Sequence, residues 1–318
     1  MTAPRVALLE AFGPDLRATV AGIVGPGLDM RYPVSNSEAD RAAALAEADY
    51  AVVRSVKMTP ALLDSAPRLK AIHQWGTGTD GIPVAEAASR GILVARSPGM
   101  NAPTVADHTV GLMLAVLKRI CVGDARMRAG AWMEPDIYAR GRDLNGARVG
   151  LVGYGATGQL VARRLAGFDC DVVYTRPSGP VEGAPGFVPF DALIGAVDIL
   201  SLHLPLTART RHLIDAATIA RMRPGTVLIN MARGGVVDQA ALLAALETGH
   251  LGGAGLDTFE PEPLPAGHPL LNAPNTVLTP HIGGGTRENF ERLVRHWSAN
   301  LIAHAAGREI DPRDLVTG

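Results

Sequence analysis

Three glycines at a fixed spacing carry the clearest chemistry in this sequence: Gly153, Gly155 and Gly158, in the run GYGATG. An apolar run at 148–152 precedes them and a helix-like run at 159–168 follows. Between a strand and a helix, the first glycine permits a tight turn, the second lets the backbone approach a pyrophosphate, and the third lets the helix pack closely on the strand. The helix N-terminus would then face the phosphate charge. The pattern predicts a dinucleotide site; because the chain has 36 glycines, the alternative is a glycine-rich surface turn.

The choice of dinucleotide is expected at the tip of the next strand, about 20 residues further on, where an acidic residue would bind a ribose 2′-hydroxyl. This strand ends in Thr175-Arg176-Pro177, with no carboxylate. A hydroxyl and a guanidinium suit a 2′-phosphate, so Thr175 and Arg176 predict that NADP(H) is preferred, with NAD(H) as the alternative. Arg176 could otherwise stack on the adenine or point into solvent.

The elements that would position these residues form two sets in which short apolar runs alternate with helix-like runs, as in parallel β-α-β units. The expected strands lie at 6–9, 51–53, 71–72 and 92–95 in the first set, and at 149–152, 172–174, 199–203, 227–229, 255–256 and 277–278 in the second. An almost wholly apolar helix at 102–119 lies between the sets, and an amphipathic helix at about 286–306 ends the pattern. The weakly patterned segment 121–147 is expected to be a loop-like excursion.

Composition narrows the class of protein. The chain has 318 residues, which suggests about two domains, and 47% hydrophobic residues with 19% charged ones exclude disorder. A net charge of −1 argues against a nucleic-acid binder, and two cysteines cannot form a four-thiolate metal site. No signal peptide, membrane span or metal site is expected, so we expect a cytoplasmic protein.

Several further motifs, in order, resemble the D-isomer-specific 2-hydroxyacid dehydrogenases. They are GTGTD (76–80), VADH (105–108), GYGATG (153–158), LHLPLT (202–207), NMARGG (230–235), LDTFEPEP (256–263) and TPHIGG (279–284). The resemblance implies an α/β fold of two doubly wound parallel-sheet domains, with a Rossmann nucleotide-binding domain inserted into a smaller flavodoxin-like substrate domain. The expected substrate domain is 1–99 plus 286–318, and the expected dinucleotide domain is 100–285.

The resemblance also implies a catalytic set. The family's arginine, glutamate and histidine fall on Arg233, Glu262 and His281. Reduction of a 2-keto acid places a hydride on C2 and a proton on the carbonyl oxygen, and His281 would donate that proton. Glu262 would favour the charged imidazole, and Arg233 would bind the carboxylate or polarise the carbonyl. Alternatively, each could be an ordinary structural residue.

Further site residues are implied in the same way. The loop of Trp75, Gly76, Thr77 and Gly78 resembles one whose backbone N–H groups hold the substrate carboxylate. Arg54, at the end of a strand of the first set, is a further candidate substrate contact. The implied dinucleotide contacts, besides Gly153, Gly155, Gly158, Thr175 and Arg176, are Thr104, Tyr154, Ala156, Thr157, His203, Pro205, Thr210 and Asp257. One departure is Asp107, where the family usually has glutamate.

The sequence therefore predicts an NAD(P)-dependent oxidoreductase that interconverts a small 2-keto acid and its D-2-hydroxy acid, with glyoxylate or hydroxypyruvate reduction as the leading expectation. Oxidation of 3-phosphoglycerate is the alternative within this chemistry, and formate or phosphite oxidation is another within enzymes. A non-catalytic NAD(H)-sensing corepressor-like module is the alternative outside them. The resemblance also implies a homodimer formed through the 121–147 excursion.

Overall fold

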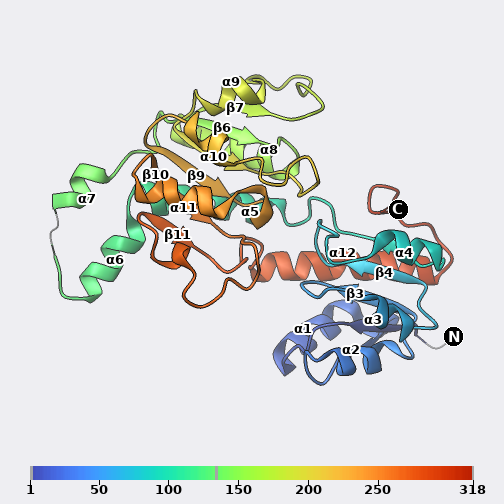
Figure 1. Cartoon of the computed structure of the whole chain (residues 1–318). Coiled ribbons are helices and arrows are strands. Elements are labelled where there is room, and N and C mark those ends of the chain that lie inside the picture. The colour runs from blue at the N-terminus through green and yellow to red at the C-terminus, as the bar shows by residue number, and fades with distance from the viewer. Residues whose placement is uncertain (1–2, 133–134, 317–318) are drawn as a thin grey trace. The chain divides into compact units, whose positions relative to one another are not determined.

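The computed structural model describes residues 3–132 and 135–316 and divides into two compact units. Unit 1 comprises the chain up to Asn101 and from Gly285 onward, and unit 2 comprises Ala102–Gly284. Each unit consists of a parallel sheet with helices packed on it (Figure 1).

Unit 1 is built on a five-stranded parallel sheet in the order β2-β1-β3-β4-β5. Its strands are β1 (Arg5–Leu8), β2 (Asp29–Arg31), β3 (Tyr50–Val53), β4 (Ala71–Gln74) and β5 (Leu93–Ala95). This is the flavodoxin-like order of a doubly wound sheet. The sequence did not predict β2, because its three residues, DMR, carry no apolar run and none of them is fully buried.

Strand alternation sends the side chains of unit 1 into two cores. Val6, Leu8 and Val52 face a core shared with α1 (Pro14–Val24) and α12 (Arg287–Ala305). Ala7, Ala51 and Val53 face the other core, which the remaining helices cover. These helices are α2 (Glu38–Leu45), α3 (Pro60–Asp64) and α4 (Val84–Ser89).

Unit 2 carries a six-stranded parallel sheet in the order β11-β10-β9-β8-β6-β7. Its strands are β6 (Arg148–Val152), β7 (Asp171–Thr175), β8 (Ile199–Leu202), β9 (Thr226–Asn230), β10 (Leu251–Leu256) and β11 (Thr276–Leu278). A single parallel bridge between Tyr174 and Phe187 marks a rudimentary strand beyond β7. Counting that bridge, the segments from the bridge to β10 follow the 3-2-1-4-5-6 order of a dinucleotide-binding sheet, with its reversal between β6 and β8, and β11 adds a seventh strand beyond β10.

Helices cover both faces of this sheet. α5 (Ala102–Leu117) and α8 (Ala156–Leu165) share one core with the inner strands (Figure 1). The opposite core is covered by α9 (Phe190–Ile194), α10 (Ala216–Ala220) and α11 (Gln239–Glu247). Two parallel-sheet α/β units of this kind confirm the predicted fold class.

The segment 121–147 differs from the prediction. It contains the C-terminal part of α6 (Ile120–Arg128) and all of α7 (Pro135–Arg140), so it is a helical arm and not a loop-like excursion. Its helices have no fully buried residue, and α6 has almost no apolar face. A helix without an apolar stripe gives no periodic signal in the sequence, which explains the error.

Within the described part of the chain, no helix is both long enough and apolar enough to cross a bilayer.

Candidate functional site

The glycine-rich loop of unit 2 lies at the carboxyl end of β6, beside the reversal of strand order. Gly153 has φ +99°, and a Cβ there would lie 2.2 Å from the carbonyl oxygen of His203. A Cβ on Gly158 would lie 2.3 Å from the carbonyl oxygen of Gly153. A Cβ on Gly155 would meet nothing within 4 Å. The first and third glycines are therefore needed by the fold, whereas the second leaves open space in front of the backbone.

That open space lies at a helix start. Gly155 is the N-cap of α8, which begins at Ala156, three residues earlier than the sequence suggested. No side chain caps this end, and the first helical amide bonded within the helix is that of Gln159. The N–H groups of Ala156, Thr157 and Gly158 are thus at the helix end that attracts anions, so the loop fits a pyrophosphate.

The tip of β7 lies next to this loop. The carbonyl of Thr175 accepts a hydrogen bond from the amide of Gly153 at 2.9 Å. Arg176 is half-buried, and its buried Nε has no hydrogen-bond partner among the described residues. The Tyr154 ring stacks on Tyr174 with centroids 3.7 Å apart, which commits that ring to the protein. A buried guanidinium nitrogen without a hydrogen-bond partner is consistent with a side chain that donates to a bound ligand.

The loop after β8 lies beside Gly153, and hydrogen bonds within the loop fix its conformation. His203 is partly buried, and this desolvation lowers its pKa to about 4, so its ring is neutral at neutral pH. Its Nε2 contacts Ser201 Oγ at 2.8 Å, while Nδ1 has no partner among the described residues. The hydroxyl of Thr210 donates to the Pro205 carbonyl at 2.7 Å and accepts from the Thr207 amide at 2.7 Å. These bonds fix the loop beside Gly153. Thr104, on α5, is buried.

Three ionisable side chains follow three neighbouring strands: Arg233 after β9, Glu262 after β10 and His281 after β11. His281 Nδ1 lies 2.8 Å from Glu262 Oε2. The hydrogen bond to Glu262 raises the pKa of His281 above its usual value, although burial opposes this. Burial would raise the pKa of Glu262, but the hydrogen bonds from His281 and from the amide of Phe259 bring it below its usual value. The pair therefore favours an ionised glutamate and a charged imidazole.

A close backbone contact brings Arg233 to this pair. A Cβ on Gly234 would lie 2.0 Å from the carbonyl carbon of Phe259, so only glycine permits the two loops to touch. Arg233 Nη1 donates to the Ala232 carbonyl at 2.8 Å, and the Arg233 carbonyl accepts from Asn230 Nδ2 at 3.0 Å. The positive charge of Arg233 lowers the pKa of both His281 and Glu262, which disfavours the charged imidazole and favours the charged carboxylate.

Asp257 is almost wholly buried, and its side chain is occupied by the protein. Its carboxylate accepts hydrogen bonds from the hydroxyl of Thr279 at 2.6 Å and from the amides of Ile282 and Gly283 at 2.9 and 2.8 Å. Sequence reasoning gave no role to Thr279. The available signal was a hydroxyl two residues before His281, but spacing alone does not reveal its partner.

In unit 1, the loop after β4 buries its aromatic residue. Trp75 is 5% exposed and its ring packs on Phe290 and Trp297, with centroids 5.1 and 5.9 Å apart. Its amide donates to the Val53 carbonyl at 2.7 Å. The ring therefore fills the core of unit 1. The amides of Gly76, Thr77 and Gly78 have no acceptor within residues 3–132 and 135–316.

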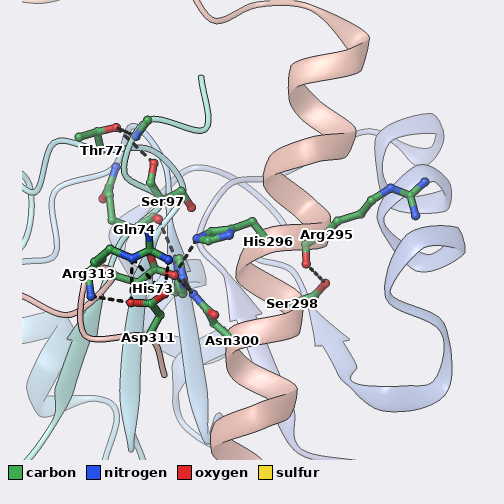
Figure 2. Close-up of polar contacts among 12 residues, drawn as sticks. His73, Gln74, Thr77, Ser97, Arg295, His296, Ser298, Asn300, Asp311 and Arg313 are labelled. Carbon is green, nitrogen blue, oxygen red and sulfur yellow. Dashed lines mark hydrogen bonds and ion pairs between the residues drawn. The ribbon is translucent and has the colours of Figure 1, made fainter. Parts of the chain in front are cut away.

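Polar contacts link this loop and the end of β4 to the rest of unit 1 (Figure 2). Thr77 Oγ1 donates to the Ser97 carbonyl at 3.2 Å. His73 is fully buried; burial lowers its pKa to about 3, and its neutral ring contacts the Gln74 carbonyl through Nδ1 at 2.8 Å. Asn300, from α12, donates to His73 Nε2 at 3.1 Å. The end of β4, from which the loop starts, is thus fixed by the hydrogen bonds of the neutral His73 imidazole.

Arg54 shares this edge of the unit 1 sheet, since it follows β3, the neighbour of β4. Its guanidinium pairs with Glu10 at 3.2 Å and its side chain is 48% exposed. Its carbonyl accepts from Gln74 Nε2 at 3.1 Å. The end of β3 and the start of the 75–78 loop are therefore tied together.

Comparison with known proteins gives a consistent result. Residues 110–283 match the model for the D-isomer specific 2-hydroxyacid dehydrogenase, NAD binding domain. The chain is 40% identical over 274 residues to a glyoxylate reductase from Thermococcus litoralis, covering 82% of each chain. It is 37% identical over 324 residues to a D-3-phosphoglycerate dehydrogenase from Mycobacterium tuberculosis, covering 100% of this chain and 60% of the relative. Among solved structures, an NADPH-dependent glyoxylate/hydroxypyruvate reductase from Sinorhizobium meliloti is 30% identical, with a TM-score of 0.85 over 99% of this chain and 98% of that one.

Alanine substitutions of Gly155 and Gly153 should affect different properties of the protein, dinucleotide binding in the first case and stability in the second. Gly155→Ala should leave the melting temperature almost unchanged but raise the dinucleotide Kd about tenfold or more, about 1.4 kcal/mol, because the methyl group occupies the open space. Gly153→Ala should destabilise the protein by about 2 kcal/mol or more, because of its positive φ and the clash with His203. Calorimetric melting and fluorescence titration with the dinucleotide measure both. Unchanged affinity in Gly155→Ala would exclude a ligand at this position.

Proposed function

Because the chain belongs to the D-isomer specific 2-hydroxyacid dehydrogenase family, and is thus an oxidoreductase acting on CH–OH groups, we propose that it reduces glyoxylate or hydroxypyruvate to the 2-hydroxy acid. The observation that carries the proposal is the 2.8 Å contact between His281 and Glu262, beside Arg233. The names of its relatives in Thermococcus litoralis and Sinorhizobium meliloti support the substrate class.

His281 is the proposed proton donor. Its Nδ1 is held by Glu262, which leaves Nε2 on the opposite side of the ring to exchange a proton with substrate. The raised pKa keeps this ring protonated to higher pH than an ordinary histidine. A bound nicotinamide supplies or accepts the hydride at substrate C2, and His281 supplies the proton that the carbonyl oxygen gains. In oxidation the same nitrogen takes that proton back.

Substrate binding is assigned to cationic and N–H donors. Arg233 offers a planar fork of donors, which suits the carboxylate of a 2-keto acid or its polarised carbonyl oxygen. The amides of Gly76, Thr77 and Gly78 are proposed to bind the carboxylate, since they have no acceptor within the described residues. The buried Trp75 would act through the position of this loop, not through its ring. Arg54, held by Glu10, is proposed as a further substrate contact.

The proposed cofactor is NADP(H), with NAD(H) as the alternative. The glycine-rich loop provides the open helix end for the pyrophosphate, and Arg176 has a buried Nε without a partner among the described residues. No carboxylate follows β7 to repel a 2′-phosphate. The remaining contacts are assigned to Thr104, Tyr154, Ala156, Thr157, Thr175, His203, Pro205, Thr210 and Asp257.

A second substrate, 3-phosphoglycerate, is favoured by one observation. The chain aligns over its whole length with a D-3-phosphoglycerate dehydrogenase, although it spans only 60% of that relative. Arg54, with a side chain 48% exposed, would then meet the substrate phosphate. Comparison of keto-acid reduction with 3-phosphoglycerate oxidation by the same preparation separates the two.

A cytoplasmic homodimer is proposed, formed through the helical arm of α6 and α7. Met127, Trp132 and Tyr138 are 61, 84 and 78% exposed on this arm. Large apolar side chains that are exposed in this way are often found at association sites.

Removing the His281 partner should change the pH dependence of reduction. The protonated imidazole is the active form, so kcat/KM for the keto acid falls as pH rises through its pKa. Glu262→Gln removes the interaction that raises this pKa, so the fall should move to lower pH. His281→Ala should lower kcat/KM by about 10²–10⁴ at pH values below the pKa of His281, and Arg233→Ala should reduce it mainly through KM. Full activity in His281→Ala would refute the assignment.

Arg176→Gln tests the choice of cofactor. The variant should raise the NADPH KM about tenfold or more while changing the NADH KM by about twofold or less, since a charge-assisted hydrogen bond contributes about 1.5–3 kcal/mol. Arg163→Gln, an exposed arginine on α8, is the matched control. A wild-type protein that prefers NADH, or equal losses for both dinucleotides, would contradict NADP(H) preference.

Light scattering tests the dimer. The wild-type protein should have twice the 33.2 kDa mass of one chain. The double variant Trp132→Ser/Tyr138→Ser should be a monomer at the same concentration, because it replaces two exposed apolar side chains of the arm. Val34→Ser, which alters an 88% exposed residue of unit 1, should remain a dimer. A monomeric wild-type protein would disprove the proposal.

A further inference from the structure

His108 lies at one end of a chain of hydrogen bonds that ends beside the proposed proton donor. Its side chain, from α5, is 23% exposed, and its Nε2 lies 3.1 Å from Thr279 Oγ1. The hydroxyl of Thr279 donates onward to Asp257 Oδ1 at 2.6 Å. His108 belongs to the VADH motif, yet it is far from the His281–Glu262 pair in sequence and has no role in the proposed reaction so far.

The far end of this chain is the backbone that follows His281. Asp257 Oδ1 accepts from the amide of Ile282, and Oδ2 accepts from the amide of Gly283. A Cβ on Gly283 would lie 2.8 Å from Asp257 Oδ2, so glycine allows the carboxylate to come this close. One buried side chain thus holds two consecutive peptide groups.

His281 itself depends on this support. Its φ is +54°, a left-handed conformation that non-glycine residues adopt only when their surroundings impose it. The His281 amide donates to the Asp257 carbonyl at 2.9 Å and to the Thr279 carbonyl at 3.0 Å. Asp257 and Thr279 therefore hold His281 on both sides in the conformation from which its ring contacts Glu262.

The direction of each hydrogen bond follows from counting protons. A threonine hydroxyl has one proton, and Thr279 gives it to Asp257. Thr279 can then only accept from His108, so Nε2 of His108 must carry a proton. The same Nε2 lies 3.6 Å from Asp257 Oδ1, where an N–H dipole or a positive charge is favourable. His108 thus orients the hydroxyl that Asp257 needs.

We propose that His108 is a positioning residue for the reaction: its Nε2–H directs the Thr279 hydroxyl to Asp257 and so keeps His281 in its left-handed conformation, with Nδ1 on Glu262. This inference rests on the proposed role of His281. It assigns to His108 no contact with substrate and no transferred proton.

The test compares four variants with one control. His108→Leu removes the donor and keeps an apolar body, whereas His108→Gln keeps an N–H at a similar reach. Thr279→Val interrupts the chain at its middle, and His108→Leu/Thr279→Val removes both groups. Asp107→Asn is the matched control, since it alters the adjacent α5 residue, which pairs with Arg164 instead.

In steady-state reduction, His108→Leu should lower kcat about tenfold, the size of one side-chain coupling, and leave the KM of the keto acid almost unchanged. His108→Gln should restore kcat to within about threefold of wild type. The double variant should be no worse than Thr279→Val, because both changes break the same chain. Additive losses, or a His108→Gln variant as slow as His108→Leu, would show that His108 merely packs and would overturn the proposal.

Hydrogen exchange provides a second readout that needs no substrate. Amide exchange in the peptide spanning 279–285 should become faster in His108→Leu, return towards wild type in His108→Gln, and stay unchanged in Asp107→Asn. Unchanged exchange in His108→Leu overturns the inference whatever the enzyme does. If the exchange changes as expected while the wild-type protein reduces no 2-keto acid, the positioning chain stands and the proposed function fails.

Discussion

Parallel pairing is the constraint on which the candidate site depends. In a parallel sheet all carboxyl ends lie on one edge, so residues far apart in the chain come together there. In unit 2 the glycine-rich loop follows β6, Arg176 follows β7 and His203 follows β8. Arg233, Glu262 and His281 follow β9, β10 and β11, the next three strands in the sheet. The proposed dinucleotide contacts and the proposed proton-transfer groups are thereby placed on adjacent parts of one edge.

Close backbone contacts then fix how these loops meet. Gly153 lies against the His203 carbonyl and Gly234 against the Phe259 carbonyl, each at a distance that excludes any side chain. Gly283 gives Asp257 the same access to the segment after His281. Gly155 differs because a side chain there would meet no protein atom within 4 Å. This open space leaves room for the pyrophosphate of the proposed dinucleotide.

The sequence predicts the fold class because buried parallel strands have short apolar runs, and ten of the eleven strands carried one. The prediction of secondary structure failed where that signal is missing. The strand β2 has the sequence DMR, and the arm of α6 and α7 has polar faces. The family, and the enzyme class with it, followed from motifs in order. Contacts made by side chains could not be predicted this way: the burial of the Trp75 ring depends on Phe290 and Trp297, from a helix more than 200 residues later. The partnership of His108 with Thr279 spans 171 positions and appears only when α5 packs on the sheet.

The His281–Glu262 pair is proposed to serve the reduction of a small 2-keto acid by a bound dinucleotide. The most direct measurement is the loss of NADPH absorbance when the wild-type protein is mixed with glyoxylate or hydroxypyruvate. We expect steady turnover with at least one of them and formation of the corresponding 2-hydroxy acid. A protein that binds NADPH but turns over neither acid would contradict it.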